Sequence, residues 1–168
     1  MNVLLFILAA VVLGYAVYAV IPTYWCKWCS RMPIKTIAGA HRIVLSFDDG
    51  PDPRYTGRLL DLLRENGMHA CFFLVAARAD RHPALVDRML AEGHQIALHA
   101  YEHKNAWCKT PGYVRRDFEK SLAVFEKYGW PLAFYRPPWG MVNLANLYYC
   151  RKHGLRFTLW SVMAEDWS

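Results

Sequence analysis

The chain has 168 residues and a formal net charge of +6 at pH 7, a length that suits one domain with a short appendage. Its lysines and arginines form no dense cluster, so we predict no nucleic-acid partner. The five cysteines are odd in number and scattered, which argues against the disulfide framework of a small secreted domain.

An uncharged apolar segment opens the chain. It runs for 19 residues, over positions 3–21, which is about the length needed to cross a bilayer as a helix. A cleaved signal peptide is the alternative interpretation, with Val17-Tyr18-Ala19 as a small-residue cleavage site. Because no lysine or arginine precedes the segment, and because it is long for the apolar region of a signal peptide, we predict an uncleaved membrane anchor over residues 1–24.

A basic linker is predicted over residues 25–41, between the anchor and the domain. Its three basic residues all follow the apolar segment, and the positive-inside rule taken alone would keep the domain in the cytoplasm. The linker also contains Cys26 and Cys29 in a C-x-x-C spacing. No second such pair supplies the remaining ligands of a zinc site, so we interpret these cysteines as two thiols at the membrane interface.

The remaining segment, residues 42–168, alternates short apolar runs with amphipathic stretches, which favours a parallel α/β sheet or a (β/α) barrel. The five strands predicted here are too few to close the usual eight-stranded barrel. Strands are predicted at 43–47, 70–75, 95–98, 132–135 and 156–160, and helices at 55–66, 83–92, 111–128 and 143–153.

Clusters of polar side chains follow four of these predicted strands. Asp48 and Asp49 come after the first strand, and residues 99–103, 136–140 and 165–167 come after the third, fourth and fifth. Because the carboxyl ends of parallel strands lie at one edge of a sheet, we expect the four clusters to converge. Taken alone, the two aspartates with the Gly-Pro after them are ordinary surface-turn chemistry.

Asp49, His99 and His103 are residues of the types that bind zinc. The spacing of the two histidines predicts that both rings lie on one side of a helical turn, where they can share a metal. One carboxylate and two imidazoles leave open positions for water and substrate, which is typical of catalytic zinc. We interpret the other five histidines as ordinary surface or capping residues: His41, His69, His82, His94 and His153.

The four clusters, in this order, resemble the motifs of the polysaccharide deacetylase family (carbohydrate esterase family 4), whose domain is also called the chitooligosaccharide-deacetylase homology domain. The resemblance extends over residues 42–168 and implies an incomplete, distorted (β/α) barrel with parallel strands, here preceded by one N-terminal transmembrane helix. Residues 46–51 resemble the first motif, 99–103 the second, 136–140 the third and 166–167 the end of the fourth.

Carried over residue by residue, the resemblance implies a metal site and a general base. Asp49, His99 and His103 would bind a divalent metal, usually Zn²⁺ in this family. Asp48 would be the general base, paired with Arg136 and oriented by it. The other implied roles are an oxyanion loop formed by Pro138, Trp139 and Gly140, tuning of the catalytic acid by Asp166, and an acetyl pocket lined by Trp167.

The implied activity is that of a metal-dependent hydrolase acting on a cell-wall-type polysaccharide. It would remove N-acetyl groups, or O-acetyl groups if the substrate resembles acetylated xylan. Such polymers lie outside the cytoplasm. We therefore expect an extracytoplasmic domain on a single-pass anchor in the cell membrane, because a large domain can be translocated against the local charge.

The chain departs from the family pattern at the donor of the final proton. In the family this donor is a histidine in a fifth motif, which would lie beyond residue 168, and His153 does not match it. Two changes, Ala100 and Met163, replace common family residues but spare the proposed metal ligands. The alternative is therefore an inactive, C-terminally truncated membrane protein that binds glycan or metal. For the 168-residue chain we expect zinc binding with little or no acetate release.

Overall fold

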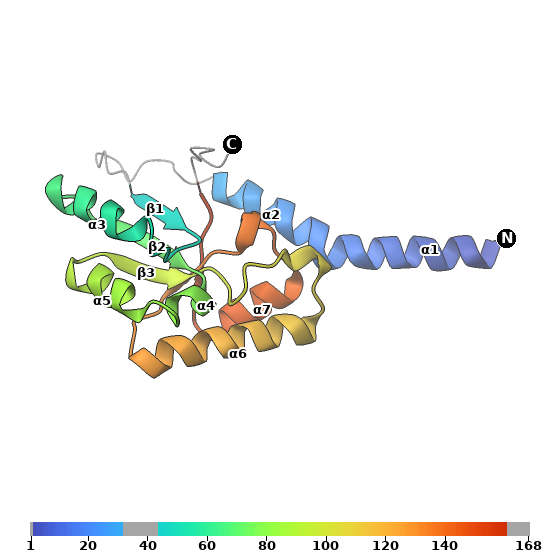
Figure 1. Cartoon of the computed structure of the whole chain (residues 1–168). Helices are drawn as coiled ribbons and strands as arrows, with labels where there is room; N and C mark the ends of the chain where they lie inside the picture. Colours follow the sequence, from blue (N-terminus) through green and yellow to red (C-terminus); the bar gives the residue numbers. More distant parts are fainter. Residues whose placement is uncertain (1, 32–43, 161–168) are drawn as a thin grey trace.

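The computed structural model describes residues 2–31 and 44–160 (Figure 1). A parallel five-stranded sheet forms the centre of the domain, and each strand pairs with the next one along the chain, in the order β1-β2-β3-β4-β5. This order lacks the reversal of a doubly wound sheet and is that of a (β/α) barrel, as predicted. The strands are Leu45–Asp48 (β1), Ala70–Leu74 (β2), Gln95–Leu98 (β3), Phe134–Tyr135 (β4) and Arg156–Phe157 (β5).

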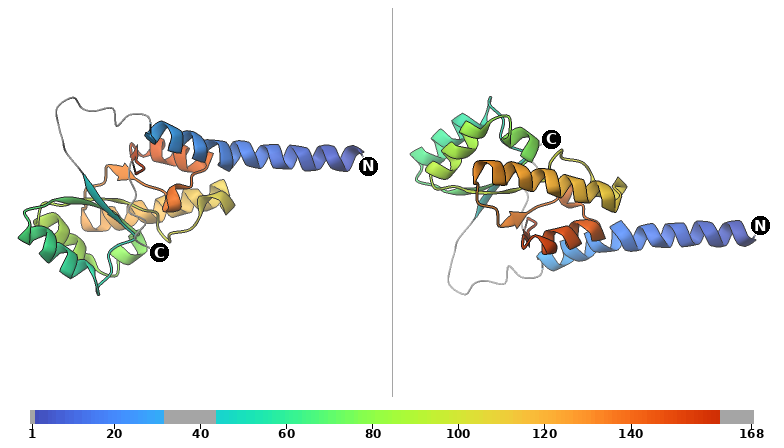
Figure 2. Two further views of the ribbon diagram at one scale, coloured as in Figure 1. Left: turned by 90° about the horizontal axis from the view of Figure 1, so that it is seen from above. Right: turned by 90° about the horizontal axis from the view of Figure 1, so that it is seen from below.

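The helices lie around the sheet, and their ends follow the signals in the sequence (Figure 2). Pro83 and Pro111 each open a helix, and Gly129 ends the longest helix of the domain in the left-handed conformation, with φ 65°. The predicted helices are Thr56–Glu65 (α3), Pro83–Ala91 (α5), Pro111–Tyr128 (α6) and Leu144–Lys152 (α7). Short helical segments that were not predicted are Ala76–Ala79 (α4), Ala106–Cys108 (η2) and Pro138–Gly140 (η3).

The hydrophobic core lies between the sheet and the helices. All residues of β2 are buried, which explains their uninterrupted apolar run, because a central parallel strand has no solvent face. The ring of Tyr135, the last residue of β4, packs 4.8 Å from the ring of Phe118 on α6. Both side chains are fully buried, so the carboxyl end of β4 is fixed against α6.

Strands β4 and β5 are shorter than predicted. The sequence predicts strands at 132–135 and 156–160, whereas only two residues of each form the ladder. Pro131 before β4 and Pro137 after it have no N–H to donate, so they confine β4 to the residues between them.

The N-terminal segment is helical throughout its described length. Helix α1 (Asn2–Tyr15) projects from the domain, and the π-helical η1 (Ala16–Val20) leads into α2 (Ile21–Arg31), which lies against the domain (Figures 1 and 2). The stretch Val3–Cys29 is long and apolar enough to cross a membrane. Helical structure therefore extends into the predicted linker, of which residues 32–41 lie outside the described part of the chain.

Candidate active site

The two adjacent aspartates at the end of β1 face different partners. Asp48 is the last residue of the strand, and Asp49 follows it with a left-handed φ of 68°. Aspartate tolerates this conformation better than most residues do, because its short polar side chain can bond locally. The change of direction separates the carboxylates, so that Asp48 contacts Arg136 whereas Asp49 contacts His99 and His103.

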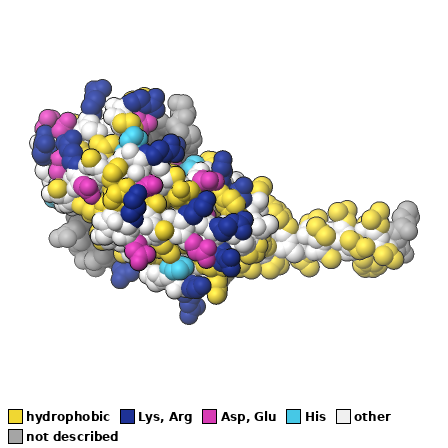
Figure 3. All heavy atoms as spheres, turned by 60° about the horizontal axis from the view of Figure 1, so that its bottom comes forward, with side chains coloured by type: hydrophobic (Ala, Val, Ile, Leu, Met, Phe, Trp, Pro, Cys, Tyr) yellow, Lys and Arg dark blue, Asp and Glu magenta, His cyan; other side chains and the backbone are white. Residues whose placement is uncertain are grey.

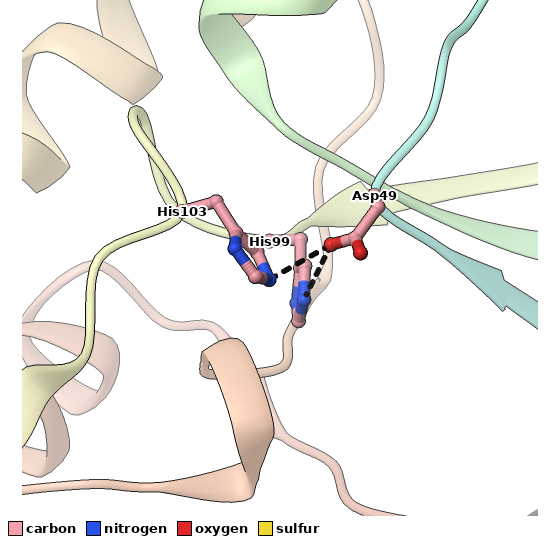
Figure 4. Close-up of side chains that lie close together, drawn as sticks. All are labelled: Asp49, His99 and His103. Carbon is pink, nitrogen blue, oxygen red and sulfur yellow. Dashed lines mark ion pairs between the residues drawn. The ribbon is translucent and has the colours of Figure 1, made fainter. Parts of the chain in front are cut away.

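Asp49, His99 and His103 converge as a potential metal site (Figure 4). Asp49 Oδ1 lies 2.9 Å from His103 Nε2 and 3.4 Å from His99 Nε2, and the three ligand atoms all lie within 4.8 Å of one another. Zinc bonds of about 2.1 Å in tetrahedral geometry place ligand atoms about 3.4 Å apart. The separations therefore fit one ion bound by all three side chains.

The tautomer of His99 also favours a cation at this point. The ring is 2% exposed, and its Nδ1 lies 2.7 Å from the carbonyl oxygen of Arg136. A carbonyl only accepts hydrogen bonds, so Nδ1 carries the proton in the neutral ring and Nε2 presents a lone pair to Asp49. Two acceptors facing each other are stabilised by a positive charge between them, which a bound metal ion or the proton of an imidazolium can supply.

The prediction that His99 and His103 share a helical turn is wrong. The segment between them is a loop, in which Ala100 and His103 have φ values of 68° and 52°. The first amides of α4, from Ala76 and Ala77, donate to the carbonyl oxygens of Ala100 and Tyr101. These bonds hold the loop in a tight curve, which brings the two imidazole rings to a centroid distance of 5.1 Å without a helix.

Two charged residues that the sequence did not single out support this loop and the turn at Asp49. Asp117 on α6 accepts a hydrogen bond from the Tyr101 N–H at 3.1 Å, and burial raises the pKa of its carboxyl to about 6. Arg78 on α4 donates to the carbonyl oxygen of Asp49. The sequence could have indicated that Asp117 is partly buried, because this acidic residue lies three residues after Val114, on the apolar face of α6.

Arg136 forms a buried ion pair with Asp48. Its Nη1 lies 2.6 Å from Asp48 Oδ1 and 3.0 Å from the hydroxyl of Ser46, and the residue is 3% exposed. The guanidinium carbon lies 3.7 Å from the centre of the Phe73 ring, a favourable cation–π arrangement. Burial lowers the pKa of Arg136, and the neighbouring carboxylate of Asp48 opposes that effect. A buried charge of this kind requires a partner, and Asp48 supplies it.

The oxyanion loop predicted from the sequence forms η3 beside the histidines. Trp139 has a φ of 54°, its ring centroid lies 4.3 Å from that of His103, and 51% of the residue is exposed. Gly140 has a φ of 62°, and a Cβ at this position would lie 2.8 Å from the Trp160 side chain, so glycine is required. The structure thus brings the loop to the candidate metal ligands, whereas Asp166 and Trp167 lie outside the described residues.

One of the other histidines differs from its prediction. His94 is buried, not at the surface, and its Nδ1 accepts the Ala70 N–H at 3.3 Å at the start of β2, away from the carboxyl edge. Burial lowers its pKa. His69 and His153 are exposed, and His82 is half-buried in front of α5, whereas His41 lies outside the described residues.

The order of the strands and the position of the polar side chains together define a (β/α) domain whose candidate site lies at the carboxyl ends of its strands. Comparison with known families matches residues 35–158 to polysaccharide deacetylase. The chain therefore belongs to the polysaccharide deacetylase family, and the predicted resemblance to this family is confirmed.

Curated relatives and solved structures agree with this membership. A peptidoglycan-N-acetylglucosamine deacetylase from Bacillus cereus is 37% identical over 75% of this chain and 60% of its own length. A chitooligosaccharide deacetylase from Sinorhizobium fredii is 35% identical over 77% of this chain and 61% of its own length. The structure of a family 4 carbohydrate esterase from Streptomyces lividans in complex with acetate gives a TM-score of 0.71 at 29% identity, covering 74% of this chain and 65% of that one. The chain thus spans about 60% of the length of these curated relatives.

Proposed function

We propose that the protein is a metal-dependent hydrolase that removes N-acetyl groups from a cell-wall-type polysaccharide, with O-acetyl groups as a second class of substrate. The observation that carries this proposal is the convergence of a three-ligand site, Asp49, His99 and His103, with the Asp48–Arg136 pair at one edge of the sheet. The names of the Bacillus cereus and Sinorhizobium fredii relatives support an N-acetylated glycan as the substrate.

Asp49, His99 and His103 are the residues that would hold the metal, and Zn²⁺ suits one carboxylate with two imidazoles. When bound, zinc supplies Lewis-acid polarisation and an acidified water for attack on an acetyl carbonyl. The chain prepares the ligands itself, because the carbonyl oxygen of Arg136 fixes the tautomer of His99 and Arg78 holds the backbone at Asp49.

Asp48 is the proposed general base. The guanidinium of Arg136 holds its Oδ1, which fixes the orientation of the carboxylate at the end of β1. The Asp48 side chain remains 19% exposed, so it can reach solvent at the site. A carboxylate held in this way can accept a proton from the attacking water, which is the task of a general base in amide hydrolysis.

The amide of Trp139 is the proposed oxyanion donor. The N–H groups of Gly140 and Met141 already donate to the carbonyl oxygens of Pro137 and Pro138. Trp139 stands in the first turn of η3, where amides have no partner within the helix, and its ring lies beside His103. This amide can therefore bind negative charge that develops on the acetyl oxygen. Asp166 and Trp167 have two further proposed roles: Asp166 would tune the catalytic acid, and Trp167 would line the acetyl pocket.

We also propose that the domain works outside the cytoplasm on a single-pass membrane anchor. Val3–Cys29 has the length and composition of a membrane span, and polymeric cell-wall substrates lie outside the cell membrane. Protease treatment of intact spheroplasts tests the orientation. Digestion of the domain without lysis is expected, and protection until lysis would contradict an exported domain.

The activity is tested on the protein produced from its complete reading frame and purified from membranes. Acetate release is measured on peptidoglycan, chitin oligomers and acetylated xylan, before and after removal of metal with a chelator. We expect release from an N-acetylated glycan, loss of release after chelation, and recovery with Zn²⁺. No release from any of the three polymers by the zinc-loaded protein would overturn the proposed function.

A further inference from the structure

The hydroxyl of Thr23, on α2, makes three hydrogen bonds to the domain. It donates to the carbonyl oxygen of Val142 at 2.7 Å, and it accepts from the Val142 N–H at 2.9 Å and from the Trp107 indole N–H at 2.8 Å. A hydroxyl has one donor and two acceptor positions, so these bonds use its full capacity. Thr23 is 1% exposed, and the loss of a buried hydroxyl would leave all three partner groups unpaired.

Val142 and Trp107, the two residues that bond to Thr23, each follow a loop of the candidate site in the sequence. Trp107 lies in η2, four residues after His103, and Val142 lies two residues after Gly140. The two loops already meet where the Asn143 side chain donates to the carbonyl oxygen of Ala106 at 2.7 Å. Thr23 therefore connects the N-terminal helix to the junction of two loops: residues 99–103, called here the histidine loop, and residues 138–140, the predicted oxyanion loop.

Other residues of the N-terminal helix also pack against the domain beside Thr23. The Tyr18 hydroxyl donates to the carbonyl oxygen of Lys109 at 3.0 Å, and Ala19 is completely buried. The ring of Tyr15 meets that of Trp107 edge-on at 6.4 Å. These contacts centre on η1, where the helix widens into a π turn, and such turns often mark functional positions.

The surface of the helix changes character at the same point. Eight large apolar residues from Val3 to Val12 are each more than half exposed, whereas Ala19 and Thr23 are buried against the domain. Figure 3 shows the same change: the projecting rod carries apolar but no charged side chains, whereas the visible face of the domain carries charged side chains interspersed with apolar ones. Only the second part of the helix therefore belongs to the packing of the domain.

We propose that Thr23 is a positioning residue, which sets the separation between the histidine loop and the oxyanion loop. The part of the N-terminal helix from Tyr15 onward thereby belongs to the working site, and the exposed apolar part before it provides the attachment to the membrane. The effect on turnover rests on the proposed deacetylase function, whereas the effect on the loops does not. Removal of the hydroxyl would free the backbone of Val142 and the indole of Trp107, and the Trp139 amide would shift relative to the metal ligands.

Hydrogen–deuterium exchange on the full chain tests the effect on the loops. In the wild type, the Val142 amide should be protected in the folded, detergent-solubilised protein. Thr23→Val keeps the shape but removes the hydroxyl, and exchange at Val142 should become about tenfold faster, whereas Thr23→Ser should restore protection. Rapid exchange at Val142 in the wild type would overturn the proposal, and this measurement does not depend on whether Thr23→Val folds. Equal protection in Thr23→Val and the wild type would also overturn it.

Steady-state deacetylation kinetics distinguish a positioning role for Thr23 from a purely structural one. Thr23→Val should lower kcat by about tenfold with KM and bound zinc unchanged, and Thr23→Ser should recover kcat. Equal loss of kcat in both variants would overturn the proposal, because it would indicate a steric role for the side chain. If the wild-type protein releases no acetate from any glycan, the proposed function fails, and the exchange at Val142 still decides the role of Thr23.

Discussion

The Nδ1 atom of His99 lies 2.7 Å from the carbonyl oxygen of Arg136, whose own guanidinium lies 2.6 Å from Asp48. One residue of the loop after β4 therefore orients a proposed metal ligand through its backbone and the proposed general base through its side chain. The proposed ion and base are held in one geometry because both depend on the position of Arg136. This coupling explains how side chains from β1, β3 and β4 can form one site.

Loss of the Arg136 charge should destabilise the fold. Arg136→Met leaves the partly buried Asp48 without its cation, and breaking such a pair costs about 3–5 kcal/mol. The free energy of unfolding, measured by urea denaturation, should fall by this amount. The double variant Arg136→Met with Asp48→Asn should recover much of the loss, because no uncompensated charge remains. Equal stability of the single and double variants would refute the coupling.

Removal of one histidine should abolish tight zinc binding. His99→Ala is expected to weaken zinc affinity by more than about 100-fold, because loss of even an outer partner of a ligand costs about 10–100-fold. Metal content after dialysis measures the effect. His153→Ala is the matched control, since this histidine is exposed and packs beside Phe118 and Tyr149. Wild-type zinc content in His99→Ala would remove this residue from the proposed site.

The buried carboxyl of Asp117 should make the histidine loop sensitive to pH. Burial raises its pKa from the model-compound value of 3.8 to about 6, so the folded state binds the proton more tightly than the unfolded state. The contribution of Asp117 to stability is therefore greatest below about pH 4 and falls as the pH rises to about 6. Across this range, the free energy of unfolding of the wild type should change by up to about 3 kcal/mol more than that of Asp117→Asn. The same pH dependence of the free energy of unfolding in both proteins would contradict the raised pKa.

The N-terminal helix should remain attached to the domain. The cleavage site considered for a signal peptide, Val17-Tyr18-Ala19, lies in the contact with the domain, where Ala19 is fully buried. Mass spectrometry of the protein extracted from membranes should find peptides that contain residues 3–21. A mature protein that begins after Ala19 would show that the helix is removed.

Helices and strands could be predicted wherever particular residue types mark their ends or their buried faces. Helix α6 follows from Pro111, the apolar spacing after it and the left-handed Gly129, and its bounds agree with the prediction. The position of the site at the carboxyl edge of the sheet could also be predicted, because the three polar clusters within the described residues each follow a strand. The convergence of Asp49, His99 and His103 was therefore predictable from strand order alone.

The features that were missed depend on tertiary contacts. No residue type indicated that Ala100 and His103 adopt left-handed conformations, and the helical spacing of the histidines favoured the wrong local structure. Burial of His94 depends on its bond to the backbone of Ala70 across the sheet. Thr23 stands in an aromatic, basic stretch typical of a membrane interface, and only the folded chain brings its hydroxyl to Val142.

The most direct test of the proposed chemistry is acetate release by the zinc-loaded protein, produced from its complete reading frame, after Asp48→Asn, with Asp61→Asn as the matched control. Asp61 lies on α3, and its side chain is 46% exposed and pairs with Arg64 and Arg88 away from the site. Loss of a positioned general base costs about 10²–10⁴-fold in rate, so Asp48→Asn should lower kcat by this factor while bound zinc stays at the wild-type level. Asp61→Asn should keep wild-type kcat. Undiminished acetate release by Asp48→Asn would contradict the assignment of this residue as the base.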